Sequence, residues 1–201
     1  QVTAVRAGSL TPTTYTNLNK ASITTMNYGQ DLPYLLEGTP STVVTSDAGA
    51  GVGYTGVRIR GVDPTRTNVT VNGIPLNDAE SHGVWWVNMP DFTSSTESMQ
   101  LQRGVGTSTN GAGAFGASLN MQTKSFQEEA YAEIANSAGS FGTRKHTLAF
   151  STGLHNNFEM NARLSNIASD GFIDRASSKM FGYFFNANYI TQKSQIKFLA
   201  F

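Results

Sequence analysis

The alternation of apolar and polar residues divides the chain into two parts with different expected structures. Up to about residue 125, short alternating runs are separated by segments with helical spacing. After Phe126, long two-residue alternations follow one another with only brief turns between them. The first part therefore predicts a small mixed sheet with short helices, and the second part predicts an antiparallel sheet.

Helical spacing and end signals in the first part predict two helices. The first covers residues 19–26, and the second covers residues 30–37 and ends at Gly38. Asn72-Gly73 predicts a tight turn after a strand, and Pro90-Asp91 predicts the start of a further short helix. Strands are expected at residues 43–46, 57–61, 68–72, 99–103 and 118–123.

The second part contains four complete strand patterns and the start of a fifth at Gln195. Each runs to roughly ten residues, above the usual strand length of about five to six. The apolar face is aromatic towards one end, near Tyr189. A soluble sheet with one wet face fits this pattern, and so do strands of a membrane barrel, which need about 9–11 alternating residues. Five such strands cannot close around anything large, so we expect a truncated barrel if the second interpretation holds.

Composition excludes several classes of protein. The formal charge is zero, from 14 basic and 14 acidic residues, so no bulk field attracts nucleic acid. Cysteine is absent, which excludes disulfides, thiolate metal sites and thiol catalysis. No apolar run reaches the roughly 18 residues that a transmembrane helix needs. Gln1 is not an initiator and no leader follows it, so we expect any signal peptide or upstream region to be missing.

The glycine-rich stretch GAGAFG contains Gly111, Gly113 and Gly116 and satisfies the spacing G-x-G-x-x-G. A dinucleotide fingerprint places these glycines between a strand and the helix that they open. Here ASLNMQTK follows, which is a strand pattern, so no helix N-terminus faces a phosphate. We interpret the stretch as a bent loop whose backbone passes close to another segment.

No other motif nominates a catalytic site. There is no G-x-S-x-G, and the three histidines lie in dissimilar contexts. Asp78, Glu80 and His82 alternate and could converge on a metal, but a solvated polar loop explains them as well, and we favour that interpretation. Trp85 and Trp86 lie in the same loop; either they form a binding surface, or one belongs to the core and the other covers an interface.

Three stretches in order give the chain a family resemblance: VRIRG at 57–61, VTVNGIPLND at 69–78 and MQLQRGVGTSTNGAGAFGASLNMQTK at 99–124. With the alternating strands that follow, they closely resemble TonB-dependent outer-membrane receptors, in the version found in Bacteroides-type bacteria. The resemblance implies an α+β plug at residues 1–125, with a small mixed sheet and short helices. It assigns residues 126–201 to the first four to five antiparallel transmembrane strands of an incomplete barrel. Asn72, Val105 and Phe115 depart from the family pattern but preserve turn and packing character.

The resemblance also implies roles for individual residues. Arg60 and Arg103 resemble plug arginines that pair with barrel glutamates; those partners would come from strands absent here, so both arginines are expected to be exposed or mispaired. Residues 1–7, with Val2, Thr3, Ala4 and Val5, resemble the tail of the segment that binds TonB by adding a strand. Outward-facing plug loops imply ligand contacts at Tyr54, Arg66, His82, Trp85 and Trp86. Structural glycines are expected at Gly61, Gly73, Gly104, Gly111, Gly113 and Gly116.

The function implied is gated import across the outer membrane of a Gram-negative bacterium, without a cofactor and without enzymatic turnover. TonB and its inner-membrane energising complex are the implied partners, together with outer-membrane lipid and a scarce nutrient ligand. That ligand could be a ferric siderophore, haem, cobalamin or an oligosaccharide, and a surface lipoprotein could assist. A secreted or surface β-rich module, such as a glycan-binding adhesin, remains the alternative interpretation, and an enzyme is a third. The adhesin requires the strands to pack their apolar faces into a soluble core.

Overall fold

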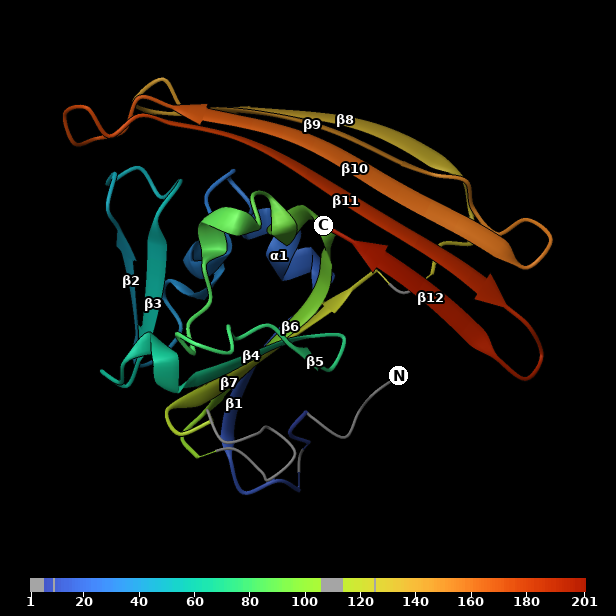
Figure 1. The fold of residues 1–201 in the computed structure, drawn as a ribbon, viewed down its shortest axis with the longest axis horizontal. Coiled ribbons are helices and arrows are strands. Elements are labelled where there is room, and N and C mark those ends of the chain that lie inside the picture. The colour runs from blue at the N-terminus through green and yellow to red at the C-terminus, as the bar shows by residue number, and fades with distance from the viewer. Residues whose placement is uncertain (1–5, 9, 106–113, 125) are drawn as a thin grey trace.

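The computed structural model describes residues 6–8, 10–105, 114–124 and 126–201, and they form two layers. Figure 1 shows a five-stranded sheet, β8 to β12, arching over a layer that contains the other strands and the helices. We call the arching sheet the meander sheet and the layer beneath it, residues 6–124, the N-terminal layer. No helix in the described ranges is long and apolar enough to cross a membrane.

The N-terminal layer contains a mixed five-stranded sheet in the order β1-β6-β7-β4-β5. Strands β4 and β7 pair in parallel, and the other neighbours pair antiparallel. Strand β1 was not expected from the sequence; it pairs along its whole length with β6. The expected mixed sheet is confirmed, with strands β1 (Thr14–Leu18), β4 (Thr67–Val71), β5 (Ile74–Pro75), β6 (Thr96–Arg103) and β7 (Ala117–Thr123).

Helices in this layer are short. The first prediction is confirmed by α1 (Lys20–Met26), where the Asn19 side chain accepts a hydrogen bond from the backbone N–H of Ser22 at 2.9 Å. The segment expected at 30–37 is instead a 3₁₀ helix, η1 (Leu32–Leu36), which begins around a proline and is too short to form an α-helix. Further 3₁₀ turns are η2 (Pro64–Arg66), η3 (Trp86–Asn88) and η4 (Phe92–Ser95), the last where Pro90-Asp91 predicted a helix.

A separate hairpin joins β2 (Thr42–Ser46) to β3 (Thr55–Ile59). The strand predicted at 57–61 ends two residues early because Arg60 and Gly61 both have positive φ, 54° and 73°, and turn the chain. Asn72 and Gly73 form the predicted tight turn between β4 and β5, also with positive φ values of 52° and 85°.

The core lies between the mixed sheet, α1 and the 3₁₀ turns. Its side chains are at most a few per cent exposed and come from every major element of the N-terminal layer. One member, Phe184, comes from the meander sheet and stacks edge-on against Phe92 with ring centroids 6.1 Å apart. Phe201, directly after the meander sheet, also contacts Phe92, with ring centroids 4.9 Å apart, so Phe92 joins the two layers through two aromatic contacts.

The meander sheet contains the five expected strands, each antiparallel to the next along the chain. They are β8 (Tyr131–Ala138), β9 (Arg144–Ser151), β10 (Phe158–Ser169), β11 (Ser178–Ile190) and β12 (Gln195–Ala200). The predicted alternation is confirmed, and the longest strands reach 12 and 13 residues.

The two faces of the meander sheet have the reverse of the polarity of a soluble sheet. On β10, Glu159, Asn161 and Arg163 point towards the N-terminal layer and are at most 4% exposed. Leu164 on the other face is 45% exposed, and Phe181 of β11 is 64% exposed. The sheet therefore buries its polar side and presents its apolar side outward, which excludes the soluble sandwich expected for an adhesin.

Candidate functional site

The contact between the two layers is centred on one carboxylate, that of Asp91. Lys145 of β9 donates to Oδ1 at 2.6 Å, and Arg163 of β10 donates through Nη1 to Oδ2 at 2.8 Å. The hydroxyl of Thr147 donates to Oδ2 at 3.1 Å, and the hydroxyls of Ser94 and Ser165 also donate to this carboxylate. Asp91 thus accepts from both layers and connects them.

Local sequence explains how Asp91 reaches the meander sheet. It has a left-handed backbone, with φ 56° and ψ 22°, a conformation that aspartate tolerates better than most residues. Phe92 next to it is 1% exposed and anchored in the core. On the opposite side, Thr147 and Ser165 are cross-strand partners, so β9 and β10 present neighbouring inward positions to the same carboxylate.

Burial and charge act in opposite directions on this carboxylate. Burial alone would raise the pKa of Asp91, but the adjacent Arg163 and Lys145, with the hydrogen bonds from Lys145 and Ser165, lower it below its ordinary value. The three charged side chains are between 1% and 5% exposed. Two cations therefore share one buried anion, and the cluster carries one excess positive charge.

A second polar contact lies nearer β12. Glu159 is fully buried and accepts from the side-chain amides of Asn161 and Asn188. Lys197 of β12 donates to the Thr123 hydroxyl at 3.1 Å and to the Lys124 carbonyl at 3.3 Å, at the end of β7. The Glu159 contacts lie within the meander sheet, whereas those of Lys197 join the two layers, whose apolar contact is formed by Phe92 with Phe184 and Phe201.

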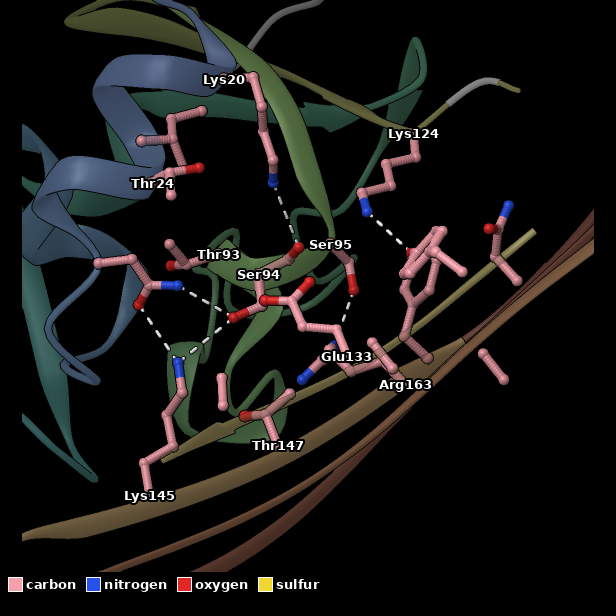
Figure 2. Close-up of a pocket in the computed structure, with 18 of the residues that line it drawn as sticks. Lys20, Thr24, Thr93, Ser94, Ser95, Lys124, Glu133, Lys145, Thr147 and Arg163 are labelled. Carbon is pink, nitrogen blue, oxygen red and sulfur yellow. Dashed lines mark hydrogen bonds between the residues drawn. The ribbon is translucent and has the colours of Figure 1, made fainter. Parts of the chain in front are cut away.

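A cavity of about 250 Å³ lies between α1, η4 and the inner faces of β8, β9 and β10. Figure 2 shows side chains from both layers pointing into this space. Its charged lining residues are Lys20, Lys124, Lys145, Arg163 and Glu133.

The tip of the β2–β3 hairpin forms a third contact with the meander sheet. The carbonyl of Ala48 accepts from the backbone N–H groups of Phe172 and Ile173, at 2.8 and 3.3 Å, in the loop between β10 and β11. A Cβ atom added to Gly49 would lie 2.9 Å from the Cβ of Phe172, so the glycine permits this close approach.

A family model, the TonB-dependent Receptor Plug Domain, matches residues 9–118. The chain belongs to this family. The N-terminal layer is therefore the plug, and we call the meander sheet, which has the arrangement of the first strands of a barrel, the wall. A comparison with curated protein sequences gives no match.

Solved receptors share the fold of both layers. The pyoverdine-bound receptor FpvA of Pseudomonas aeruginosa matches with 18% identity and a TM-score of 0.74, over 90% of this chain and 23% of its own. The ferric-catecholate import receptor Fiu of Escherichia coli K12 matches with 19% identity and a TM-score of 0.69, over 89% and 25%. The siderophore receptor PiuA of Acinetobacter baumannii matches with 18% identity and a TM-score of 0.67, over 89% and 24%. The chain spans about a quarter of the length of these receptors.

The residues expected to meet ligand lie at separate places on the plug. Tyr54 is 61% exposed beside the hairpin tip, whereas Arg66 follows the other end of β3, in η2. Trp85 is 56% exposed, but Trp86 is 6% exposed within the core, so one tryptophan is a core residue. No hydrogen bond in the described part of the chain links these residues or His82 to one another. Their ligand contacts stay predictions, and a contact by the Trp86 side chain would require it to leave the core.

The two plug arginines lie next to each other beside β1. Arg60 is exposed and donates to the Thr14 hydroxyl at 3.1 Å. Arg103 is 7% exposed and donates to the Pro40 carbonyl at 2.8 Å and to the Thr16 hydroxyl at 2.7 Å. Burial and the nearby Arg60 lower the pKa of Arg103. Neither arginine pairs with a carboxylate in the described ranges. Arg60 is exposed and Arg103 is buried on neutral acceptors, and their pairing with barrel glutamates stays a prediction.

Glycines of the plug serve different local purposes. Gly104 has a φ of 96°, and its N–H donates to the carbonyl of Gly116 at 2.8 Å. A Cβ atom on Gly116 would lie 2.8 Å from Cγ1 of Val62 and 3.3 Å from the carbonyl oxygen of Arg66. The close approach expected for the glycine-rich stretch is therefore present at Gly116. Gly111 and Gly113 lie outside the described residues, as do Val2, Thr3, Ala4 and Val5.

The alternating acidic and histidine residues at 78–82 form a turn. Asp78 accepts from the backbone N–H groups of Glu80 and Ser81 at 3.1 and 2.7 Å. These hydrogen bonds lower the pKa of Asp78, because they favour its charged form. Within the described ranges, no group of three histidine, cysteine, aspartate or glutamate side chains could hold a metal ion.

Sequence reasoning missed the Asp91 cluster. Lys145 and Arg163 occupy inward positions of strands whose inward face also carries neutral polar residues such as Thr147 and Ser165. A lysine and an arginine on the polar face of expected barrel strands are the signal that could have indicated a plug carboxylate. Choosing Asp91 among the plug carboxylates required the three-dimensional structure.

Proposed function

We propose that this chain forms the plug and the first barrel strands of a TonB-dependent import receptor in the outer membrane of a Gram-negative bacterium. Residues 1–125 form the plug and residues 126–201 form strands of the barrel. The observation that carries the proposal is the reversed polarity of the wall, which buries Arg163 against the plug and exposes Phe181 and Leu164 on the opposite face.

This polarity fits a lipid environment on one side and a plugged lumen on the other. In a membrane barrel, outward residues meet hydrocarbon and inward residues meet a polar interior. Tyr189, Ile196 and Phe198 lie outward near the turn between β11 and β12 and are 46%, 67% and 58% exposed. Aromatic residues at strand ends match the interfacial girdle of such barrels.

The mechanism is gated import. Ligand binds at the hairpin-tip end of the plug, where Tyr54 is exposed, with Trp85 as a further contact. TonB, energised by the proton gradient of the inner membrane, adds a strand to the segment around Val2–Val5 and pulls the plug to open the lumen. The protein makes and breaks no covalent bond in its cargo. The solved receptors named above are a pyoverdine-bound receptor, a ferric-catecholate import receptor and a siderophore receptor, which supports a ferric siderophore as cargo.

Uptake of radioactive iron by a receptor-deletion strain tests this function. Cells complemented with the wild-type receptor should take up one class of ferric chelate, and an uncoupler should abolish uptake while leaving surface binding. Val5→Pro should also abolish uptake, because proline removes the backbone donor that strand addition needs, whereas Val5→Ala should retain it. Wild-type uptake in Val5→Pro cells or in uncoupled cells would contradict the proposal.

A further inference from the structure

The cavity between plug and wall is lined by more positive than negative charge. Four of its lining side chains are basic, and Glu133 is the only acidic one among the described residues. Asp91, just outside the lining, neutralises one of the two wall cations that contact it. Glu97 also lies close enough to Lys20 to raise its pKa, so the cavity and its immediate surroundings carry one excess positive charge, in a setting where burial strengthens electrostatic attraction.

Two lysines from the plug account for this excess. Lys20 extends from α1, and Lys124 follows the end of β7 (Figure 2). Neither forms an ion pair among the described residues. Burial and the nearby charge of Lys124 lower the pKa of Lys20, and the carboxylates of Glu97, Glu133 and Asp91 offset part of this effect.

Their hydrogen bonds leave donor capacity unused. The Lys20 ammonium reaches the carbonyls of Ser94 and Thr96 only at 3.4 and 3.2 Å. The Lys124 ammonium donates to the Tyr131 hydroxyl at 2.9 Å and lies 4.7 Å from the centre of its ring. An ammonium group has three donors, so each lysine retains at least one for a further acceptor.

A buried hydroxyl in the lining also lacks a partner. Thr93 of η4 is 1% exposed, and its Oγ1 atom has no hydrogen-bond partner. Most buried polar groups in native proteins are paired, so an unpaired hydroxyl beside a cavity indicates a missing water, ion or ligand group. This observation is independent of the charges, although the Oγ1 atom itself is buried and has no surface open to the cavity.

We propose that this cavity binds a small oxyanion, either a carboxylate or a phosphate group, between Lys20 and Lys124. The two ammonium groups supply charge-assisted hydrogen bonds. The site requires the plug to rest against the wall as the structure shows, but it requires neither TonB nor import. It therefore extends beyond the proposed function and stands or fails separately from it.

Calorimetric titration of a detergent-purified receptor that contains this chain tests the site without transport. Inorganic phosphate and citrate are the probes, each at low and at high sodium chloride. We expect saturable binding with one site per receptor, weakened by salt and weakened about tenfold or more by the combined Lys20→Met and Lys124→Met substitutions. Tighter citrate binding would identify a carboxylate of the cargo as the ligand, and tighter phosphate binding would identify free phosphate.

Two further variants exclude a general effect of charge or folding. Lys193→Met removes a charge from the exposed turn between β11 and β12 and should leave binding unchanged. Glu133→Gln removes the competing carboxylate and should tighten binding severalfold, a gain that a folding defect cannot produce. Absence of saturable binding, equal loss in Lys193→Met, or weaker binding in Glu133→Gln would each overturn the proposal.

Discussion

Removing the Asp91 carboxylate should loosen the plug from the wall. Asp91→Ala leaves Lys145 and Arg163 buried without their counter-ion, because both are at most 5% exposed and no other carboxylate pairs with them in the described part of the chain. Breaking a buried ion pair by removing one partner costs about 3–5 kcal/mol. Since about 1.4 kcal/mol corresponds to a factor of ten, opening of the interface should become about a hundredfold or more easier.

Amide hydrogen exchange measures this opening in the detergent-purified receptor. Peptides that cover β6 report on the plug sheet, and peptides that cover β9 report on the wall. Exchange in these peptides should accelerate about a hundredfold or more in Asp91→Ala if it occurs through separation of the layers. The matched control is Asp63→Asn, which removes the exposed ion pair between Arg58 and Asp63, 3.8 Å apart, keeps an oxygen that can cap η2, and should leave exchange unchanged.

A triple variant decides whether charge is the cause. Replacing Asp91 with leucine, and Lys145 and Arg163 with methionine, removes the stranded charges together with their partner. Buried ion pairs can be replaced by apolar residues at little cost, so this variant should recover most of the lost protection. Acceleration below about tenfold in Asp91→Ala, or no recovery in the triple variant, would refute the reasoning, because water would then be solvating the cluster.

Three further predictions test other parts of the plug. Burial raises the pKa of Asp31 to about 7, so between about pH 4 and pH 7 the folded state holds a proton that the unfolded state loses. The free energy of unfolding should therefore fall as the pH rises through this range. In urea unfolding, Asp31→Asn should remove up to about 4 kcal/mol of this pH dependence. Gly116→Ala should cost about 1–3 kcal/mol by overpacking, measured as protease resistance of the plug, whereas Gly8→Ala, with open space around it, should be neutral. Trp86→Ala should cost about 3–5 kcal/mol because it empties part of the core, whereas Trp85→Ala should lower ligand affinity and leave the unfolding midpoint unchanged.

Features that depend on local periodicity were predicted from the sequence. The alternation of Phe158, Met160 and Leu164 with polar residues fixed which side of β10 faces outward, because side chains on a strand alternate between faces. The tight turn at Asn72-Gly73 after β4 was equally readable, since such turns depend on a few adjacent residues.

Features that depend on distant residues were not predicted. Strand β1 has the sequence TYTNL, which carries too little apolar alternation to stand out, and it exists because it pairs with β6. The Asp91 cluster joins residues 54 and 72 positions apart. Its polar partners resemble any lumen-facing residues in the sequence. Only the packing of the plug on the wall brings them together.

The chemistry of the interface explains how a plug could seal a barrel and still be released. An intramolecular hydrogen bond contributes only about 0.5–1.5 kcal/mol net, because water replaces it when the contact opens. The polar contacts of Lys197 with Thr123 and Lys124 can therefore separate at modest cost once water enters. The Asp91 cluster and the Phe92–Phe184 pair are different. When water reaches only one side of these contacts, it does not replace the interaction energy of the buried ion pairs or of the apolar contact. A pulling force applied to the N-terminal segment would therefore meet its main resistance at η4, where both contacts lie within two consecutive residues.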